Sequence, residues 1–409
     1  MRLYTMTPIR TGYRLAAGVT PATEQYAGLM KRLAALPSED VTLVNKDAER
    51  SGRWKDIAVD GFDLRVAIFE PGHKAGEPEV RFHIYGSGVA IAEVRFDDVD
   101  AANGDLEGWS QTESHKAYKG HVSAFCALLE RMGRLTGDLL EGNPARCGEV
   151  EHGHTSRALV ISEAERADPA TAPLVQDWLK NTIRPEDAGD ILAGEAHYSL
   201  TWLNYLIVEP DGEEGPKETQ FLLSAMRIAQ YFWSAQDWAN ESTRQIVADA
   251  LTARRPRRAE QSLLRARSRM QMLQIEYESL RAVLNRRKEK LVSEILDTWS
   301  IDALKANGAQ LVELSSGKIK EISAARTRRS EFVTGLILFG IGAVAVLEAI
   351  FAAISFSREV MLRPALGYTD EQGSLLLRII AAADSDFLLG SGLILILLLT
   401  VIYVRYQRK

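Results

Sequence analysis

The stretch VTGLILFGIGAVAVLEAIFAAIS occupies positions 333–355 and contains one charged residue, Glu348. It lies in a longer run, 332–356, that has no Lys, Arg or Asp. A helix rises about 1.5 Å per residue, so a run of this length can cross a hydrocarbon core of about 30 Å. We therefore expect residues 332–356 to form a first transmembrane helix.

A second apolar run at 387–404 predicts a second transmembrane helix. Basic residues stand just before the first run and just after the second, and such flanks stay in the cytoplasm. The segment 357–386 is therefore expected to be an external loop, and residues 405–409 a basic cytoplasmic tail. The predicted location is a bacterial-type inner (plasma) membrane, multi-pass in lipid, with both termini cytoplasmic. The first residues, MRLYTMTPIRTGYRL, lack the apolar core of a cleavable signal.

Residues 1–253 alternate between strand-like and helix-like patterns, which predicts a cytoplasmic α/β domain that we interpret as a sensor. Apolar residues alternate with polar ones over 80–84, Gly86-Ser87-Gly88 offers a turn, and the alternation resumes beyond it, as in a β-hairpin. Further strands are expected at 64–69, 158–161 and 202–208. Long helices are expected at 116–140 and 218–253.

Residues 254–331 predict a helical stalk between this domain and the membrane, straight or kinked near Gly308. Apolar residues step alternately by four and three along it, as in a coiled coil. The residues of this heptad seam are Ala266, Met270, Leu273, Tyr277, Leu280 and Leu284. The seam predicts a homo-oligomer. The net charge of −6 averages very different regions and indicates no class of partner. Two cysteines in a domain expected to be cytoplasmic argue against a disulfide framework.

The order of an α/β domain, a long helix, two C-terminal spans and a basic tail resembles the CorA-like divalent-cation channel superfamily, most specifically over residues 257–409. The Gly-Met-Asn tripeptide of that family is absent, since the residues after the first span read SFSREVMLRPALGY (355–368). The resemblance implies a pentamer whose first span lines a cation pore, with Mg²⁺ or another divalent cation as the ion. CorA-like proteins also act as membrane effectors beside nucleotide-signalling antiviral systems, so a defence effector with a nucleotide-type ligand is one alternative. A membrane-anchored scaffold without a pore is the other.

Within the first span, a helical period aligns Glu348 with small and hydroxylated residues. The candidate pore-lining residues are Thr334, Ile341, Ala345, Glu348, Ala352 and Ser355. An ionised acid facing lipid near the bilayer centre costs at least about 2.5 kcal/mol, whereas a ring of carboxylates in an oligomer admits cations. The alternative is that Glu348 lies near the outer interface or bonds to the second span.

The strongest basic feature is the cluster Arg254, Arg255, Arg257 and Arg258, followed by Arg265, Arg267 and Arg269. It could hold the phosphates of a nucleotide ligand or anionic lipid headgroups, or it could simply be solvated. Acidic stretches at 97–113 and 209–218 are candidates for Mg²⁺ or Ca²⁺, and CGEVEHGH at 147–154 for zinc, but no ligand set is assigned. Signatures such as Walker A, G-x-G-x-x-G after a strand, H-E-x-x-H and G-x-S-x-G are absent, so we expect a non-enzyme with no nucleic-acid partner.

Overall fold

A computed structural model describes residues 1–362 and scattered positions between 375 and 401; within 1–362 it leaves out 17–18, 20–22, 37–39, 44–63, 75, 100–104, 143–149, 182–183, 185, 201–202 and 253–255. The chain divides into two compact units, Met1–Gly317 and Lys318–Lys409. Most of the expected external loop, part of the expected second transmembrane helix and all of the basic tail lie outside the described residues; the described positions of the second run are helical.

The N-terminal unit is built on an eight-stranded mixed sheet with the order β3-β4-β5-β6-β1-β8-β10-β9. Its strands are β1 (Arg2–Arg10), β3 (Val41–Leu43), β4 (Arg65–Phe69), β5 (Glu79–Tyr85), β6 (Val89–Phe96), β8 (Ser156–Ser162), β9 (Tyr198–Leu200) and β10 (Asn204–Glu209). The pairing of β8 with β10 is parallel and the other neighbours are antiparallel. A separate ribbon pairs β2 (Tyr13–Leu15) with β7 (Leu140–Gly142). The predicted α/β class is confirmed.

The β-hairpin expected around Gly86-Ser87-Gly88 is formed by β5 and β6, with Phe82 opposite Ala92. Gly88 has a φ of +94°, a conformation that other residues rarely adopt, so the turn depends on glycine here. The strands expected at 64–69, 158–161 and 202–208 are confirmed as β4, β8 and β10.

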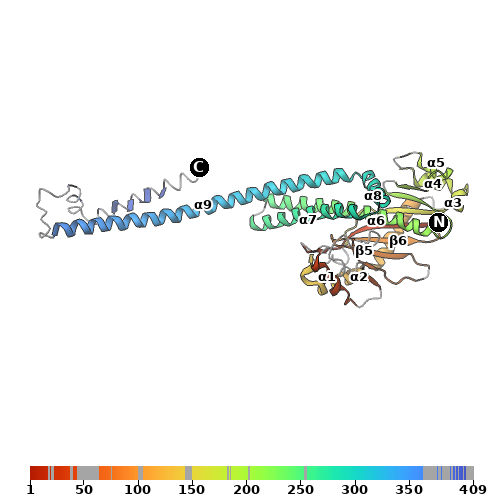
Figure 1. The fold of residues 1–409 in the computed structure, drawn as a ribbon, viewed down its shortest axis with the longest axis horizontal. Helices are drawn as coiled ribbons and strands as arrows, with labels where there is room; N and C mark the ends of the chain where they lie inside the picture. The colour runs from red at the N-terminus through yellow and green to blue at the C-terminus, as the bar shows by residue number, and fades with distance from the viewer. Residues whose placement is uncertain are drawn as a thin grey trace. The chain divides into compact units, whose positions relative to one another are not determined.

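Long helices cover both faces of the sheet (Figure 1). On one face lie α1 (Glu24–Leu33) and α2 (Leu106–Thr136); on the other lie α6 (Gly215–Thr252) and α7 (Pro256–Val283). The expected helix at 218–253 corresponds closely to α6. By contrast, α2 begins ten residues before the expected 116, because the Asp105 carboxylate accepts a hydrogen bond from Gly108 N at 2.9 Å and caps the helix.

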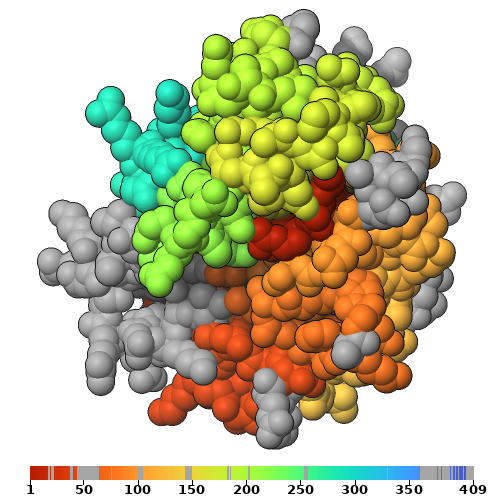
Figure 2. Space-filling model, turned by 90° about the vertical axis from the view of Figure 1, so that its right-hand side faces the viewer, coloured from red at the N-terminus to blue at the C-terminus, as the bar shows by residue number. Residues whose placement is uncertain are grey.

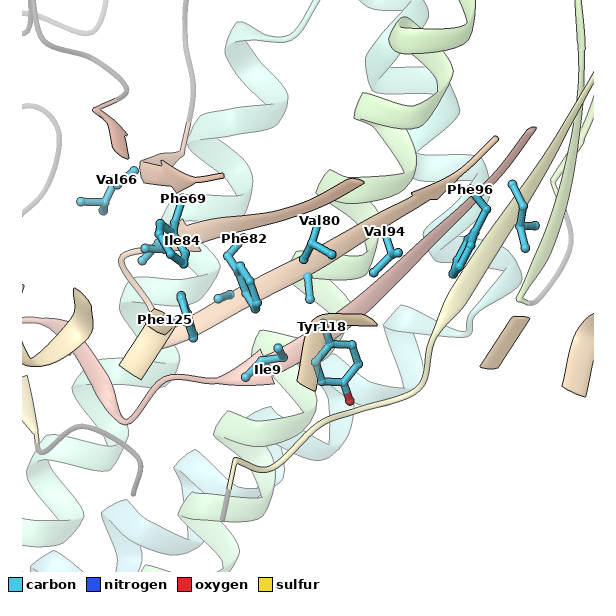
Figure 3. Packing of buried hydrophobic residues seen from close by; sticks show 14 of the residues in the cluster. Ile9, Val66, Phe69, Val80, Phe82, Ile84, Val94, Phe96, Tyr118 and Phe125 are labelled. Atoms are coloured by element: carbon cyan, nitrogen blue, oxygen red, sulfur yellow. The ribbon is translucent and has the colours of Figure 1, made fainter. Parts of the chain in front are cut away.

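The core beneath α2 is aromatic, as Figure 3 shows. Phe82 of β5 stacks on Phe125 of α2 with ring centroids 4.4 Å apart, and Phe69 of β4 stacks on Phe82 at 5.8 Å. At one end of the sheet, the red surface of the first residues lies between the yellow-green α3–α5 segment and the orange strands and α2 (Figure 2). That segment comprises α3 (Glu163–Ala167), α4 (Ala172–Trp178) and α5 (Asp187–Ala193), and a short 3₁₀ helix, η3 (Gly137–Leu139), follows α2.

The range expected to form one stalk contains three helices: α7, α8 (Arg286–Thr298) and α9 (Ile301–Leu362). The first break follows α7, where the Asn285 side chain accepts from Lys288 N at 2.8 Å and caps α8. The second lies at Ser300, whose φ is +53°. Helix α9 then continues through Gly308 without interruption.

The heptad seam lies on the face of α7 that is buried within the chain. Met270, Leu273, Tyr277 and Leu280 are each at most 7 % exposed, and Tyr277 packs edge-on against Phe232 of α6 with centroids 5.0 Å apart. The seam therefore belongs to the core of one chain and offers no free surface to a second copy.

Candidate functional site

The apolar segment 333–355 lies in α9. Among the described residues, α9 is the one helix long and apolar enough to cross a membrane. Large apolar side chains along it are open, including Leu338 at 64 % and Ile341 at 62 % exposed. Such a surface is unfavourable in water and suits a bilayer, where a helix also satisfies its own backbone groups. We treat α9 as carrying a candidate membrane-spanning segment.

One face of this segment, here called the covered face, is partly or fully buried, and the other residues of the segment are exposed. The residues between 332 and 357 that are partly or fully buried are Phe332, Gly335, Phe339, Ala343, Leu347, Ile350, Ile354 and Ser357. They step by three or four, so they form one line along the helix. This covered face becomes tightest toward its end, where Ile354 is 6 % and Ser357 0 % exposed.

The candidate pore-lining residues share the opposite side of the helix. Thr334, Ile341, Ala345, Glu348, Ala352 and Ser355 are all exposed. At about 100° of rotation per residue, their centre lies about 180° from the covered face. The structure thus places the six on one open face, here called the Glu348 face. That this face lines a pore stays a prediction.

Glu348 is the one acidic residue of this apolar segment. Among the described residues, none forms a hydrogen bond or ion pair with it. The nearest charged neighbours in sequence, Arg358 and Glu359, lie ten or more residues away, which is about 15 Å along a helix. A carboxylate so isolated needs a partner or a water-filled surrounding from outside this helix.

The described arginines of the basic cluster and of the residues that follow it lie in two different surroundings. Arg254 and Arg255 lie outside the described residues, and Arg257 and Arg258 are exposed on the first turn of α7. Farther along α7, Arg265 and Arg269 are one helical turn apart and line a cavity together with Arg14 of β2. Their spacing of four was visible in the sequence. Arg14 was not found, because no local pattern links it to residues about 250 positions away.

The acidic stretches are largely engaged in ion pairs. Glu209 meets Arg2 at 2.5 Å, Asp97 meets Arg95 at 3.0 Å, and Glu218 pairs with Arg287. Residues 106–113 are helix rather than loop. Within the part of the chain that the structure describes, no three His, Cys, Asp or Glu side chains come together as a metal site. Residues 147–149 of the CGEVEHGH stretch lie outside that part.

Comparison of the chain with known proteins gives no relative. No family model matches it, no curated protein matches it, and no solved structure matches it.

Proposed function

We propose that the protein is a homo-oligomeric membrane channel that passes cations and is gated through its N-terminal unit. The observation that carries the proposal is the Glu348 face. An apolar helix that is covered on one side presents its lone carboxylate, with small and hydroxylated residues, on the opposite side. Copies of the chain that met along this face would turn the carboxylates toward a common axis.

The chemistry of such an axis favours cations. A ring of carboxylates is a standard device for cation selection, and a water-filled axis removes the cost of burying each charge in lipid. Small residues such as Ala345 and Ala352 allow helices to approach closely. The CorA-like layout implies five copies, and Mg²⁺ or another divalent cation is the ion to test first. In place of the family's Gly-Met-Asn tripeptide, we assign the selecting role to Glu348.

The test is cation flux from proteoliposomes, measured for the parent chain, Glu348→Gln and Glu331→Gln. Glu348→Gln keeps the size of the side chain and removes its charge, so flux or cation preference should fall by about tenfold or more if the ring attracts the ion. Glu331→Gln is the matched control, because Glu331 is exposed on the same helix outside the apolar segment. It should behave like the parent.

Assembly is checked in parallel by mass photometry in detergent. If the parent conducts, and the Glu348→Gln variant assembles and shows the same flux and the same cation preference, Glu348 does not line the pore. A chain that stays monomeric, or that gives no flux across a range of voltages and ions, would favour the membrane-anchored scaffold.

A further inference from the structure

A cavity of about 540 Å³ lies in the N-terminal unit between the β2–β7 ribbon, α6 and α7. Four arginines line it: Arg10 on β1, Arg14 on β2, and Arg265 and Arg269 on α7. Neither the CorA-like resemblance nor the proposed pore assigns a role to this cavity.

Two of these arginines, Arg14 and Arg269, face the same carboxylate, that of Glu141 on β7. Arg14 Nε lies 3.7 Å from it and an Arg269 terminal nitrogen lies 3.9 Å from it, both beyond hydrogen-bond distance. Arg14 Nε is buried and has no hydrogen-bond partner among the described residues. Such a buried donor costs free energy until an acceptor reaches it.

The arginines also repel one another. Burial lowers the pKa of Arg269 to about 10, and the neighbouring charges of Arg14 and Arg265 act in the same direction against the Glu141 carboxylate. Burial, with a contribution from Arg265, likewise lowers the pKa of Arg14. Guanidinium groups stay charged at neutral pH, so an anion placed among them would relieve repulsion and satisfy free donors.

Two other charged residues line the cavity in the part of the chain that the structure describes, Arg10 and Glu276, and neither supplies a full negative charge. Arg10 is already paired with Glu151 at 2.7 Å and with Glu241 at 3.0 Å. Glu276 accepts a hydrogen bond from Tyr231 Oη at 2.7 Å, and burial raises its pKa to about 7, so it is substantially protonated at neutral pH. Among the described residues that line the cavity, the other three guanidinium groups face Glu141 and a partly protonated Glu276, which leaves a net positive charge.

The rest of the cavity wall is mostly apolar and aromatic, with a few serine and threonine hydroxyls. Its aromatic members are Tyr13, Tyr26 and Trp238, and its aliphatic members include Leu15, Val89 and Leu273. A bare inorganic ion would leave most of this surface against water. An occupant that also carries a planar ring system would cover it.

We propose that this cavity binds a small organic phosphate with a planar ring system, of which a nucleotide is the test case, with the phosphate among Arg14, Arg265 and Arg269. A phosphate monoester carries about −1.5 to −2 charges at pH 7, which matches the excess positive charge, and its oxygens accept from several guanidinium groups at once. A carboxylate ligand would neutralise only one charge.

The cavity shares its helices with the first turns of α9. Asn240 of α6 donates from Nδ2 to the Leu304 carbonyl at 2.8 Å, and Lys305 lies over the Tyr277 ring of α7 at 3.6 Å. An occupant held by α6 and α7 would therefore act on helices that contact α9. This consequence for gating rests on the proposed channel, whereas binding itself does not.

The test is isothermal titration calorimetry on the detergent-solubilised full chain with AMP, GMP and the cyclic dinucleotides c-di-AMP and c-di-GMP, against adenosine and inorganic phosphate. At least one nucleotide should bind more tightly than both of its parts. Arg269→Ala and Arg265→Ala should each weaken that binding about ten- to hundredfold, the range expected for lost charged hydrogen bonds. Lys at either position should restore it only in part, because an ammonium lacks the planar fork of a guanidinium.

Two further variants keep the result interpretable if an arginine variant unfolds. Ala239→Trp fills the cavity from α6 without touching its charge and should abolish nucleotide binding. The double variant Arg257→Ala/Arg258→Ala removes the exposed arginines of the same helix and should leave binding unchanged. The proposal is overturned if no probe nucleotide binds at millimolar concentration, or if binding survives both Arg269→Ala and Ala239→Trp. Because the readout is heat of binding, this outcome is independent of whether the protein conducts ions.

Discussion

At the scale of single residues, the polar network inside the N-terminal unit is fixed by what each side chain can donate. Arg65 has only donors, so His83 Nδ1 must accept at 3.0 Å, and the proton of the ring lies on Nε2, 3.2 Å from Glu93 Oε2. Arg227 also donates to this carboxylate oxygen, from Nε at 3.0 Å and from a terminal nitrogen at 2.8 Å. Burial, then the charge of Arg227, lowers the pKa of His83 to about 4, so the ring is neutral and Glu93 balances Arg227.

This network gives a stability prediction. Glu93→Gln leaves the buried Arg227 charge without its counter-ion, and breaking a buried pair in this way costs about 3–5 kcal/mol in the free energy of unfolding. Glu79→Gln is the matched control on the neighbouring strand, because Glu79 pairs with Arg81 and Arg95 at a partly exposed site and should change stability by less than about 1 kcal/mol. Urea unfolding of the full chain in detergent, followed by tryptophan fluorescence, measures both. Equal losses in the two variants would contradict the burial argument.

At the scale of elements, the sequence pattern predicted the strands and helices that have one apolar and one polar side. The β5–β6 hairpin was predictable because alternation surrounds a glycine turn, and α6 because its apolar residues follow a helical period. The central strand β1 was missed: seven consecutive residues, Leu3–Ile9, are buried, so no alternation marks them. It also contains Pro8, which lies beyond the stretch Arg2–Met6 that pairs with β8.

Helix α7 shows a different limit of the sequence. The heptad seam was interpreted as a contact between copies of the chain, because a period of 3.5 residues indicates that one side of a helix is covered. The period does not report what covers it. Here α6 of the same chain does so, because the two helices are joined by a short connection and pack side by side (Figure 1).

Two glycines of α9 should respond in opposite directions to alanine. A Cβ at Gly308 would lie 2.8 Å from Asn240 Oδ1 and 2.6 Å from Met270 Cε, whereas a Cβ at Gly317 meets nothing within 4 Å. Gly317→Ala should stabilise the chain by up to about 1 kcal/mol through helix propensity. Gly308→Ala should destabilise it by about 1–2 kcal/mol, because Asn240 is held by its bond to Leu304 and overpacking outweighs the propensity gain.

Urea midpoints of the two variants, measured side by side, test this difference. A stabilised Gly308→Ala variant would show that α9 does not need a close approach to α6. From the sequence, both glycines were expected only to weaken the helix. The local sequence does not distinguish a glycine against which another helix packs closely from one that has no such neighbour.

At the scale of the whole molecule, the two candidate sites differ in how far the sequence could show them. Glu348 is visible because an acid interrupts an apolar run, and its face follows from helical geometry alone. The arginine cavity joins β2, β7 and α7, which are far apart in sequence, so only the fold brings Arg14 to Arg265 and Arg269. That Arg254, Arg255, Arg257 and Arg258 bind an anion stays a prediction, while Arg265 and Arg269, about two to three turns farther along α7, line the cavity.

The last prediction concerns assembly through α9, and it compares two neighbouring alanines. Ala345 lies on the Glu348 face and Ala343 on the covered face, so only Ala345 should meet its counterpart in another copy. With a mild oxidant in proteoliposomes, Ala345→Cys should form more disulfide-linked dimer than Ala343→Cys, because a disulfide needs Cα atoms about 4.4–6.8 Å apart and only the Glu348 face would turn toward other copies. Ala343→Cys should give no more dimer than the parent, which carries Cys126 and Cys147 as background.

Dilution with excess lipid separates assembly from random collision, because cross-linking within an oligomer persists. Equal cross-linking at both positions, or its loss on dilution, would show that copies do not meet along the Glu348 face and that the carboxylate is matched by another partner.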